Sequence, residues 1–159
     1  KHAEPHFTAE KRALHPYKVF RTFNFMILRE TFLKHPFDET ITHYGHEDTL
    51  FGLVLKKEGI KILHIDNPLM NCGLDTNRNV LRKTEESLRT LYVHRDKLER
   101  SSGVHRLYGT LQRLHLVLFV SLLYRLCRPM IRRNLYFFAF YKVGYYCSLF
   151  DKNNSLVNQ

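Results

Sequence analysis

The most informative stretch of the chain is YGHEDTLFG, residues 44–52, in which a glycine turn leads into two adjacent acids. After the acids, apolar residues recur at the spacing of one helical face: Leu50, Phe51, Val54 and Leu55. Gly59 then supplies a residue suited to ending a helix. We therefore predict a helix over residues 48–58 with Glu47 and Asp48 at its N-terminus, where the helix dipole favours carboxylates.

Short strands are predicted on both sides of this helix. Residues 19–28 (VFRTFNFMIL) are aromatic and β-branched with alternating Phe and Ile, which is typical of a buried strand that carries Asn24 on its other face. Residues 60–65 (IKILHI) predict a second strand, and residues 68–72 a further extended piece. The predicted elements are therefore short strands and helices.

The chain changes character after residue 100. Residues 77–100 predict a charged helix with one apolar side, which ends at Ser101-Ser102-Gly103. Beyond it, residues 107–127 and 135–150 are dominated by Leu, Phe and Tyr and are separated by a basic hinge at 128–133. We therefore predict two domains, residues 1–100 and a helical tail over residues 101–159.

The positive charge of the protein lies in its C-terminal half. Residues 1–76 hold ten basic and ten acidic side chains, whereas residues 77–159 hold 15 and 5. Neither apolar segment makes a good membrane span, because the cleanest run, residues 114–124, is well below the roughly 20 residues that a spanning helix needs. Basic residues border the aromatic ones here: Arg113, Arg125, Arg128, Arg132, Arg133 and Lys142. This pattern predicts helices lying on an anionic membrane surface; alternatively, they cap the domain with their basic residues in solvent.

Other functional classes find less support. Three cysteines lack a C-x-x-C pair or zinc-finger spacing, which favours buried, reduced thiols: Cys72, Cys127 and Cys147. Nucleic-acid binding is not expected, because the basic residues lie in a Leu/Phe background and not beside an exposed aromatic platform. Metal-dependent hydrolysis through His43, His46, His64 and Asp66 is not expected either, because His43-x-x-His46 lacks the i, i+4 spacing of a helical zinc pair.

Taken alone, Glu47-Asp48 is more often a solvated helix cap than a catalytic pair. Four blocks in register favour the second interpretation: Phe23-Asn24-Phe25-Met26-Ile27, Phe37-Asp38-Glu39, residues 44–52, and Ile62-Leu63-His64-Ile65-Asp66-Asn67-Pro68. In order and spacing, across roughly residues 15–100, they resemble the second half of bacterial family 2 glycosyltransferases. The resemblance implies a GT-A type α/β fold and an inverting transfer of a sugar from a nucleotide-sugar donor to an acceptor hydroxyl.

The resemblance also implies roles for single residues. Asp48 would accept the proton of the acceptor hydroxyl as a general base, and Glu47 would orient the acceptor by hydrogen bonding. Gly45, His46 and Asn24 would line the acceptor site, which would take a glycan or a lipid-linked acceptor. The alternative is a non-catalytic membrane-interaction or scaffold module, in which the two acids only cap a helix.

The family also implies a divalent metal, Mg²⁺ or Mn²⁺, which offsets the charge of the leaving diphosphate. The Asp-x-Asp motif that supplies its main ligands does not occur in these 159 residues. We therefore expect those ligands and the donor half upstream of Lys1, and little transfer activity from this stretch alone. Asn71, where the family often has histidine, and His64 are candidate ligands within the chain. We expect a cytoplasmic location, peripheral at the inner face of the cell membrane.

Overall fold

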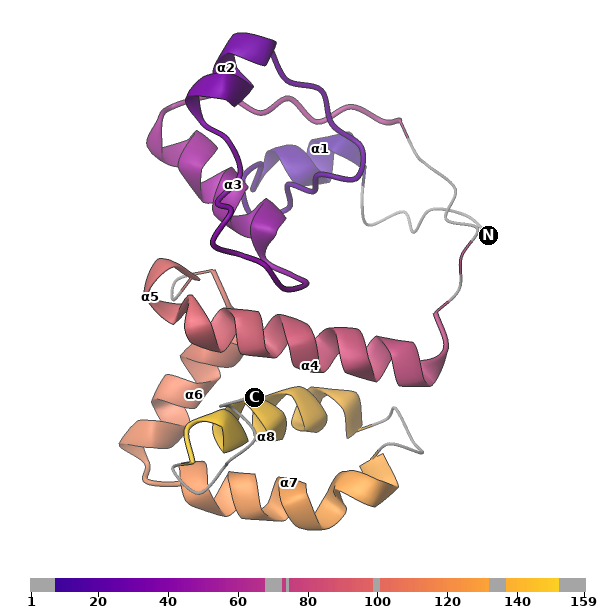
Figure 1. The fold of residues 1–159 in the computed structure, drawn as a ribbon, viewed down its shortest axis with the longest axis vertical. Coiled ribbons are helices and arrows are strands. Elements are labelled where there is room, and N and C mark those ends of the chain that lie inside the picture. The colour runs from indigo at the N-terminus through magenta and orange to yellow at the C-terminus, as the bar shows by residue number, and fades with distance from the viewer. Residues whose placement is uncertain (1–7, 68–72, 74, 99–100, 132–136, 152–159) are drawn as a thin grey trace. The chain divides into compact units, whose positions relative to one another are not determined.

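The computed structural model describes residues 8–67, 73, 75–98, 101–131 and 137–151. These residues form helices that are joined by turns and extended backbone (Figure 1). The chain divides into two compact units, the first comprising residues 1–42 and 46–74 and the second residues 43–45 and 75–159. The sequence predicted a boundary after residue 100, whereas residues 77–93 fold with the C-terminal helices.

The first unit is a small aromatic core with three short helices: α1 (Ala9–Ala13), α2 (Arg29–Lys34) and α3 (Glu47–Lys57). Its centre is Phe51 of α3, which is 2% exposed. Four other phenylalanine rings surround it, with Phe37 nearest at 4.7 Å between ring centroids: Phe20, Phe25, Phe32 and Phe37. A Cβ on Gly52 would lie 2.7 Å from the carbonyl oxygen of Tyr17, so this close approach requires glycine.

The predicted α/β fold is wrong. The structure is 62% helix, and none of the described residues belongs to a strand. Residues 19–28 form turns and irregular backbone, and Phe23, predicted to be buried, is 77% exposed. The mixed sheet of a GT-A type fold is therefore not found in the described part of the chain.

The physical reason is that a strand requires a hydrogen-bonded neighbour. Residues 60–65 form no strand and have no regular secondary structure, and Ile60 and Ile62 pack on the aromatic core. No described segment pairs with them, so the apolar residues of 19–28 and 60–65 bury surface by packing around Phe51 and not by forming a sheet. The extended piece predicted at 68–72 lies outside the described residues.

The predicted helix starts are confirmed. Helix α3 begins at Glu47 and ends before Gly59, whose φ is 68°. Helix α4 (Asn77–Val93) begins as predicted, and the Thr76 hydroxyl accepts a hydrogen bond from the backbone N–H of Asn79 as an N-cap. The predicted helix over 77–100 breaks at His94 and resumes as α5 (Arg95–Leu98).

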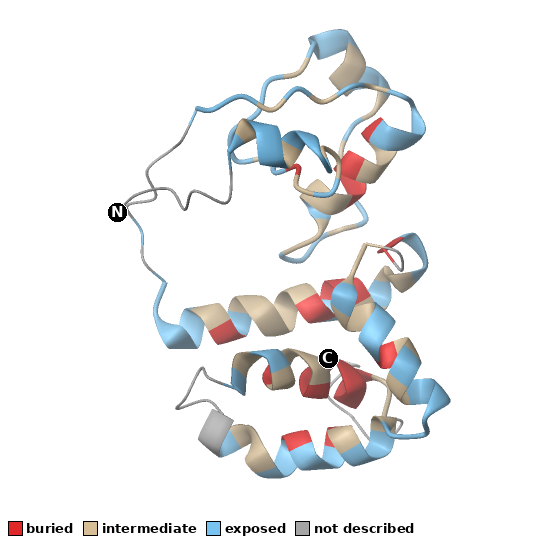
Figure 2. Cartoon of the chain, turned by 180° about the vertical axis from the view of Figure 1, so that it is seen from behind, coloured by how far each residue is buried: buried red, intermediate tan, exposed pale blue. Residues whose placement is uncertain are grey.

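The second unit is a helical bundle built around α8 (Phe138–Leu149), which packs on α4, α6 (Gly103–Arg113) and α7 (Val117–Ile131). Figure 2 shows that α8 carries more buried residues than any other helix of this unit. They include three tyrosines: Tyr141, Tyr145 and Tyr146. A Cβ on Gly144 would lie 2.5 Å from the Cβ of Tyr124, so glycine lets α7 and α8 approach closely.

The second unit contains two described cysteines and the first residues of the predicted hinge. Cys147 is fully buried and Cys127 half-buried, both as free thiols, while Cys72 lies outside the described residues. Burial raises the pKa of the Cys147 thiol to about 11, so this thiol stays protonated at neutral pH. The first residues of the predicted hinge belong to α7, which continues through Pro129 to Ile131.

Candidate functional site

The acids at the start of α3 are presented by two consecutive left-handed residues. Gly45 has a φ of 100° and His46 a φ of 72°, and the His46 carbonyl accepts the first helical hydrogen bond from Leu50 at 2.9 Å. The His46 side chain caps no helix N–H group. The chain therefore turns sharply at Gly45-His46 and places Glu47 and Asp48 in the first turn of α3, where the N–H groups of the helix end favour carboxylates.

The two acids differ in their surroundings. Oδ2 of Asp48 lies 3.5 Å from Nε of Arg21, and its side chain is 19% exposed. Oδ1 of Asp48 accepts a hydrogen bond from the Thr49 hydroxyl at 3.3 Å. Glu47 is exposed and makes no ion pair or hydrogen bond with its side chain in the described part of the chain. Asp48 is thus oriented by its neighbours, while Glu47 is open to a ligand.

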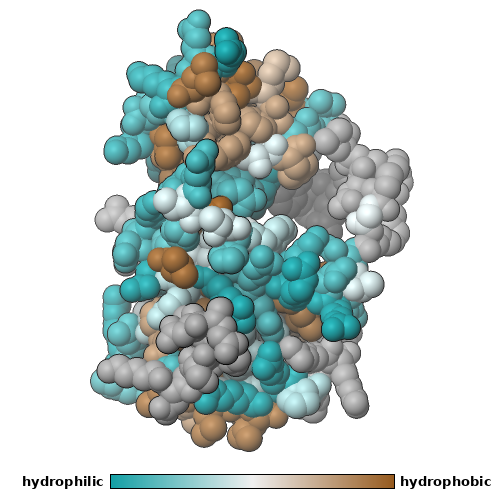
Figure 3. Space-filling model, viewed as in Figure 1, coloured by the Kyte–Doolittle hydropathy of each residue, from teal (hydrophilic) through white to brown (hydrophobic). Residues whose placement is uncertain are grey.

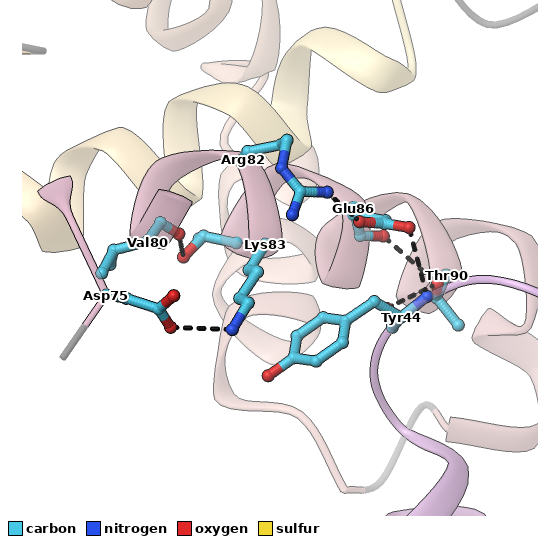
Figure 4. A network of polar contacts seen from close by, with 8 residues as sticks. Tyr44, Asp75, Val80, Arg82, Lys83, Glu86 and Thr90 are labelled. Carbon is cyan, nitrogen blue, oxygen red and sulfur yellow. Dashed lines mark hydrogen bonds and ion pairs between the residues drawn. The ribbon is translucent and has the colours of Figure 1, made fainter. Parts of the chain in front are cut away.

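The residues before the acids are anchored on α4, a feature that the sequence did not reveal (Figure 4). The Thr90 hydroxyl donates to the Tyr44 carbonyl at 3.1 Å, and the Tyr44 N–H donates to Oε1 of Glu86 at 3.4 Å. The Lys83 ammonium lies 5.7 Å from the centroid of the Tyr44 ring. No local pattern in the sequence marks Thr90 for its contact with Tyr44, since the two residues are 46 positions apart.

Only glycine fits the backbone geometry at position 45. A Cβ at this position would lie 2.6 Å from Oγ of Ser87 on α4. Its φ of 100° also disfavours any other residue. Gly45 is therefore required by the turn itself, and a role in binding an acceptor stays a prediction.

The other family-like blocks meet in the first unit. Phe25, Phe37 and Ile62 all pack on the core around Phe51. The Asn24 side chain donates to the Asn67 carbonyl at 2.9 Å, which ties two of the blocks together at the surface. Segments up to 43 residues apart in sequence thus form one unit with the acids of α3. Asn24 bonds to Asn67, and no hydrogen bond or ion pair among the described residues joins its side chain to either acid.

His64 does not have the surroundings of a metal ligand. Its Nδ1 accepts a hydrogen bond from Nε of Arg12 at 3.3 Å, and its Nε2 lies 3.0 Å from the Pro16 carbonyl, so both ring nitrogens are engaged. A guanidinium beside the ring also opposes a cation there. Asp66 caps α1 by accepting from the Ala9 N–H at 2.7 Å and pairs with Arg12 at 3.6 Å.

The described residues contain no group of three or more His, Cys, Asp or Glu side chains that could hold a metal ion. Asn71, the other candidate ligand, lies outside the described residues. The donor groups of the described residues therefore do not fit a metal ion, and no step assigned to these residues runs through one.

A polar network supports α8 in the second unit. The Tyr141 hydroxyl donates to Glu85 of α4, which also lies 3.5 Å from Arg128 of α7. Burial and the hydrogen bond to Glu85 raise the pKa of Tyr141 above its ordinary value. The Tyr145 hydroxyl accepts from Nε of Arg89 at 2.6 Å. These contacts join three helices inside the bundle, and the network is structural.

The chain was compared with known proteins. No protein-family model, curated protein or solved structure matches it.

Proposed function

We propose that the first unit contributes the acceptor side of an inverting sugar transfer, with Asp48 as the general base. The observation that supports this proposal is the placement of Asp48, which is oriented by Arg21 and still 19% exposed at the start of α3. The resemblance to family 2 glycosyltransferases supplies the reaction, and it concerns the blocks that pack together with α3 in one unit.

The reaction assigns a simple task to Asp48. The acceptor oxygen forms a bond to the anomeric carbon of the donor while the bond from that carbon to the diphosphate oxygen breaks. The electron pair leaves with the nucleoside diphosphate, and the acceptor proton passes to the carboxylate of Asp48. A carboxylate suffices as the base, because the hydroxyl becomes acidic as it attacks, and good placement then matters more than basicity.

The neighbours of Asp48 have defined parts in this proposal. Arg21 and Thr49 each occupy one carboxylate oxygen, and each oxygen retains a further lone pair for the acceptor proton. Glu47, exposed and without a partner among the described residues, accepts a hydrogen bond from a second hydroxyl of the acceptor. The donor and its metal are bound by residues other than these.

The test is transfer by the full-length protein, measured as release of nucleoside diphosphate from a panel of nucleotide sugars with glycan and lipid-linked acceptors. Asp48→Asn is expected to lower kcat/KM by roughly 10²–10⁴-fold, the usual contribution of a general base. Glu47→Gln is expected to act mainly on the KM for the acceptor. Glu58→Gln, an exposed acid directly after the other end of the same helix, is the matched control and should leave both constants unchanged.

The non-catalytic interpretation makes the opposite prediction. If the acids only cap α3, a folded Asp48→Asn protein transfers sugar at the wild-type rate. That result would contradict the role of Asp48 as the general base. Under that interpretation, substitutions at Arg128, Arg132 and Arg133 in the basic part of the chain have the larger effect.

A further inference from the structure

Helix α7 exposes an apolar face that the fold does not use. Leu118, Leu122 and Leu126 follow one another at i, i+4 spacing and are 67%, 57% and 72% exposed. Together with their exposed neighbours they make up what we call the α7 outer face: Leu114, Leu116, Leu118, Phe119, Leu122, Leu123 and Leu126. Figure 3 shows hydrophobic side chains gathered at the bottom of the molecule, where Figure 1 places α7.

The opposite side of α7 packs in the core of the bundle. Ser121 and Tyr124 are 1% and 3% exposed, and Tyr124 packs against Gly144 of α8. The leucines of the outer face therefore contribute little to folding. A contiguous exposed apolar surface of this kind marks a site of interaction with another molecule or a membrane.

The charge around this face identifies the occupant. Residues 101–150 contain seven Lys and Arg side chains and no Asp or Glu. Arg113, which ends α6 beside the face, is exposed and has no acidic partner among the described residues. Arg125 lies on α7 itself, and its side chain is 41% exposed. It pairs with Asp151, which directly follows residues 101–150. Arg113 and the Arg125–Asp151 pair together leave a net positive charge beside this face, and an apolar surface with a positive border complements anionic lipid headgroups above an acyl layer.

The length of the helix decides how it meets the lipid. The 15 residues of α7 span about 22 Å, short of the roughly 30 Å hydrocarbon core of a bilayer. In the described part of the chain, no single helix is long and apolar enough to cross a membrane; α6 and α7 pass only as a pair bent by 119°. The bend falls at His115, whose φ is 55°, and places Leu114 and Leu116 on an exposed corner.

We propose that the α7 outer face lies in the headgroup region of an anionic membrane, parallel to its surface. The leucines and Phe119 enter the boundary with the acyl chains, and Arg113 and Arg125 contact lipid phosphates. This surface lies in the second unit and does not include Asp48. Membrane binding and the proposed sugar transfer can therefore be tested separately.

The experiment is co-sedimentation of the chain with phosphatidylcholine vesicles that contain or lack phosphatidylglycerol, across a salt series. Wild-type protein is expected to bind the phosphatidylglycerol vesicles, and less so at high salt. A Leu122→Glu/Leu126→Glu variant should bind at least roughly tenfold more weakly, since two apolar side chains no longer enter the interface. Arg113→Gln should weaken binding roughly fivefold, and only to the anionic vesicles.

The matched control is Met26→Glu/Leu63→Glu, which places the same two charges on residues of the first unit that are 97% and 86% exposed. This variant should bind like the wild type, and circular dichroism should show every variant folded. Equal binding by the Leu122→Glu/Leu126→Glu variant overturns the proposal. So does wild-type protein that ignores the vesicles and instead forms dimers through this face or binds an oligonucleotide.

Discussion

The two units of this protein bury apolar surface in different ways, and the difference separates their uses. The first unit gathers phenylalanine rings from loops around one residue, Phe51 of α3. The second unit distributes its core along α8, between α4, α6 and α7. A core made from loops leaves the N-terminus of a short helix accessible, which suits a site for a small ligand. A bundle leaves the outer face of a whole helix accessible, which suits binding to an extended surface such as a membrane.

The largest effect is expected from Phe51→Ala. Removing the ring on which four others pack costs about 3–5 kcal/mol, a value typical of a buried aromatic residue and a large fraction of the stability of so small a unit. Amide hydrogen exchange should show residues of α3 losing protection while α8 keeps it, because the second unit has a core of its own. Phe23→Ala, at a ring that is 77% exposed, is the control and should leave exchange unchanged. Equal loss of protection in both units would mean that they share one core.

Gly144→Ala is expected to destabilise the second unit by about 1–3 kcal/mol, because the added methyl group collides with Tyr124 and forces α7 away from α8. Thermal unfolding measures this loss. Gly109→Ala on α6 is the matched control, since nothing lies within 4 Å of the added Cβ. There the better helix propensity of alanine should raise stability by up to about 1 kcal/mol. A Gly144→Ala protein as stable as the wild type would show that α7 and α8 can separate without cost.

Alkaline pH should destabilise the second unit more than the first. Burial raises the pKa of Cys147 from 9.0 to about 11 and raises the pKa of Tyr146 and Tyr141 above their ordinary values. The unfolded chain therefore loses these protons at lower pH than the folded one does. The stability contributed by the neutral groups is present below pH 9 and is lost as the pH rises through 9 to 11 and beyond, by about 1.4 kcal/mol for each unit of difference in pKa.

Unfolding of each unit, followed by NMR between neutral pH and pH 11, checks this expectation. The buried core of the first unit is Phe20, Phe51 and Leu55, which have no proton to lose, so the first unit should keep more of its stability over this range than the second unit does. Unfolding of both units at the same pH would contradict this prediction.

The sequence revealed the local features of the fold and missed the non-local ones. The start of α3 at Glu47 and the start of α4 at Asn77 depend on residues within one turn, and both were predictable. The strands were predicted from apolar alternation, which does not tell whether a partner strand is present. Nor does any local pattern reveal that Thr90 holds Tyr44, because that contact joins residues 46 positions apart.

The smallest effect on stability is expected at the site itself. Asp48→Asn removes an ion pair whose arginine is half exposed, and such pairs contribute about 0–1 kcal/mol because solvent screens them. Asparagine also remains acceptable in the first turn of α3. Thermal unfolding of Asp48→Asn should therefore fall within about 1 kcal/mol of the wild type, and Arg21→Gln should behave alike because it breaks the same pair. This near-neutrality makes the transfer assay decisive, since a folded Asp48→Asn protein that has lost transfer lacks its base and not its structure. A clearly larger loss of stability would instead assign Asp48 to the architecture of the first unit.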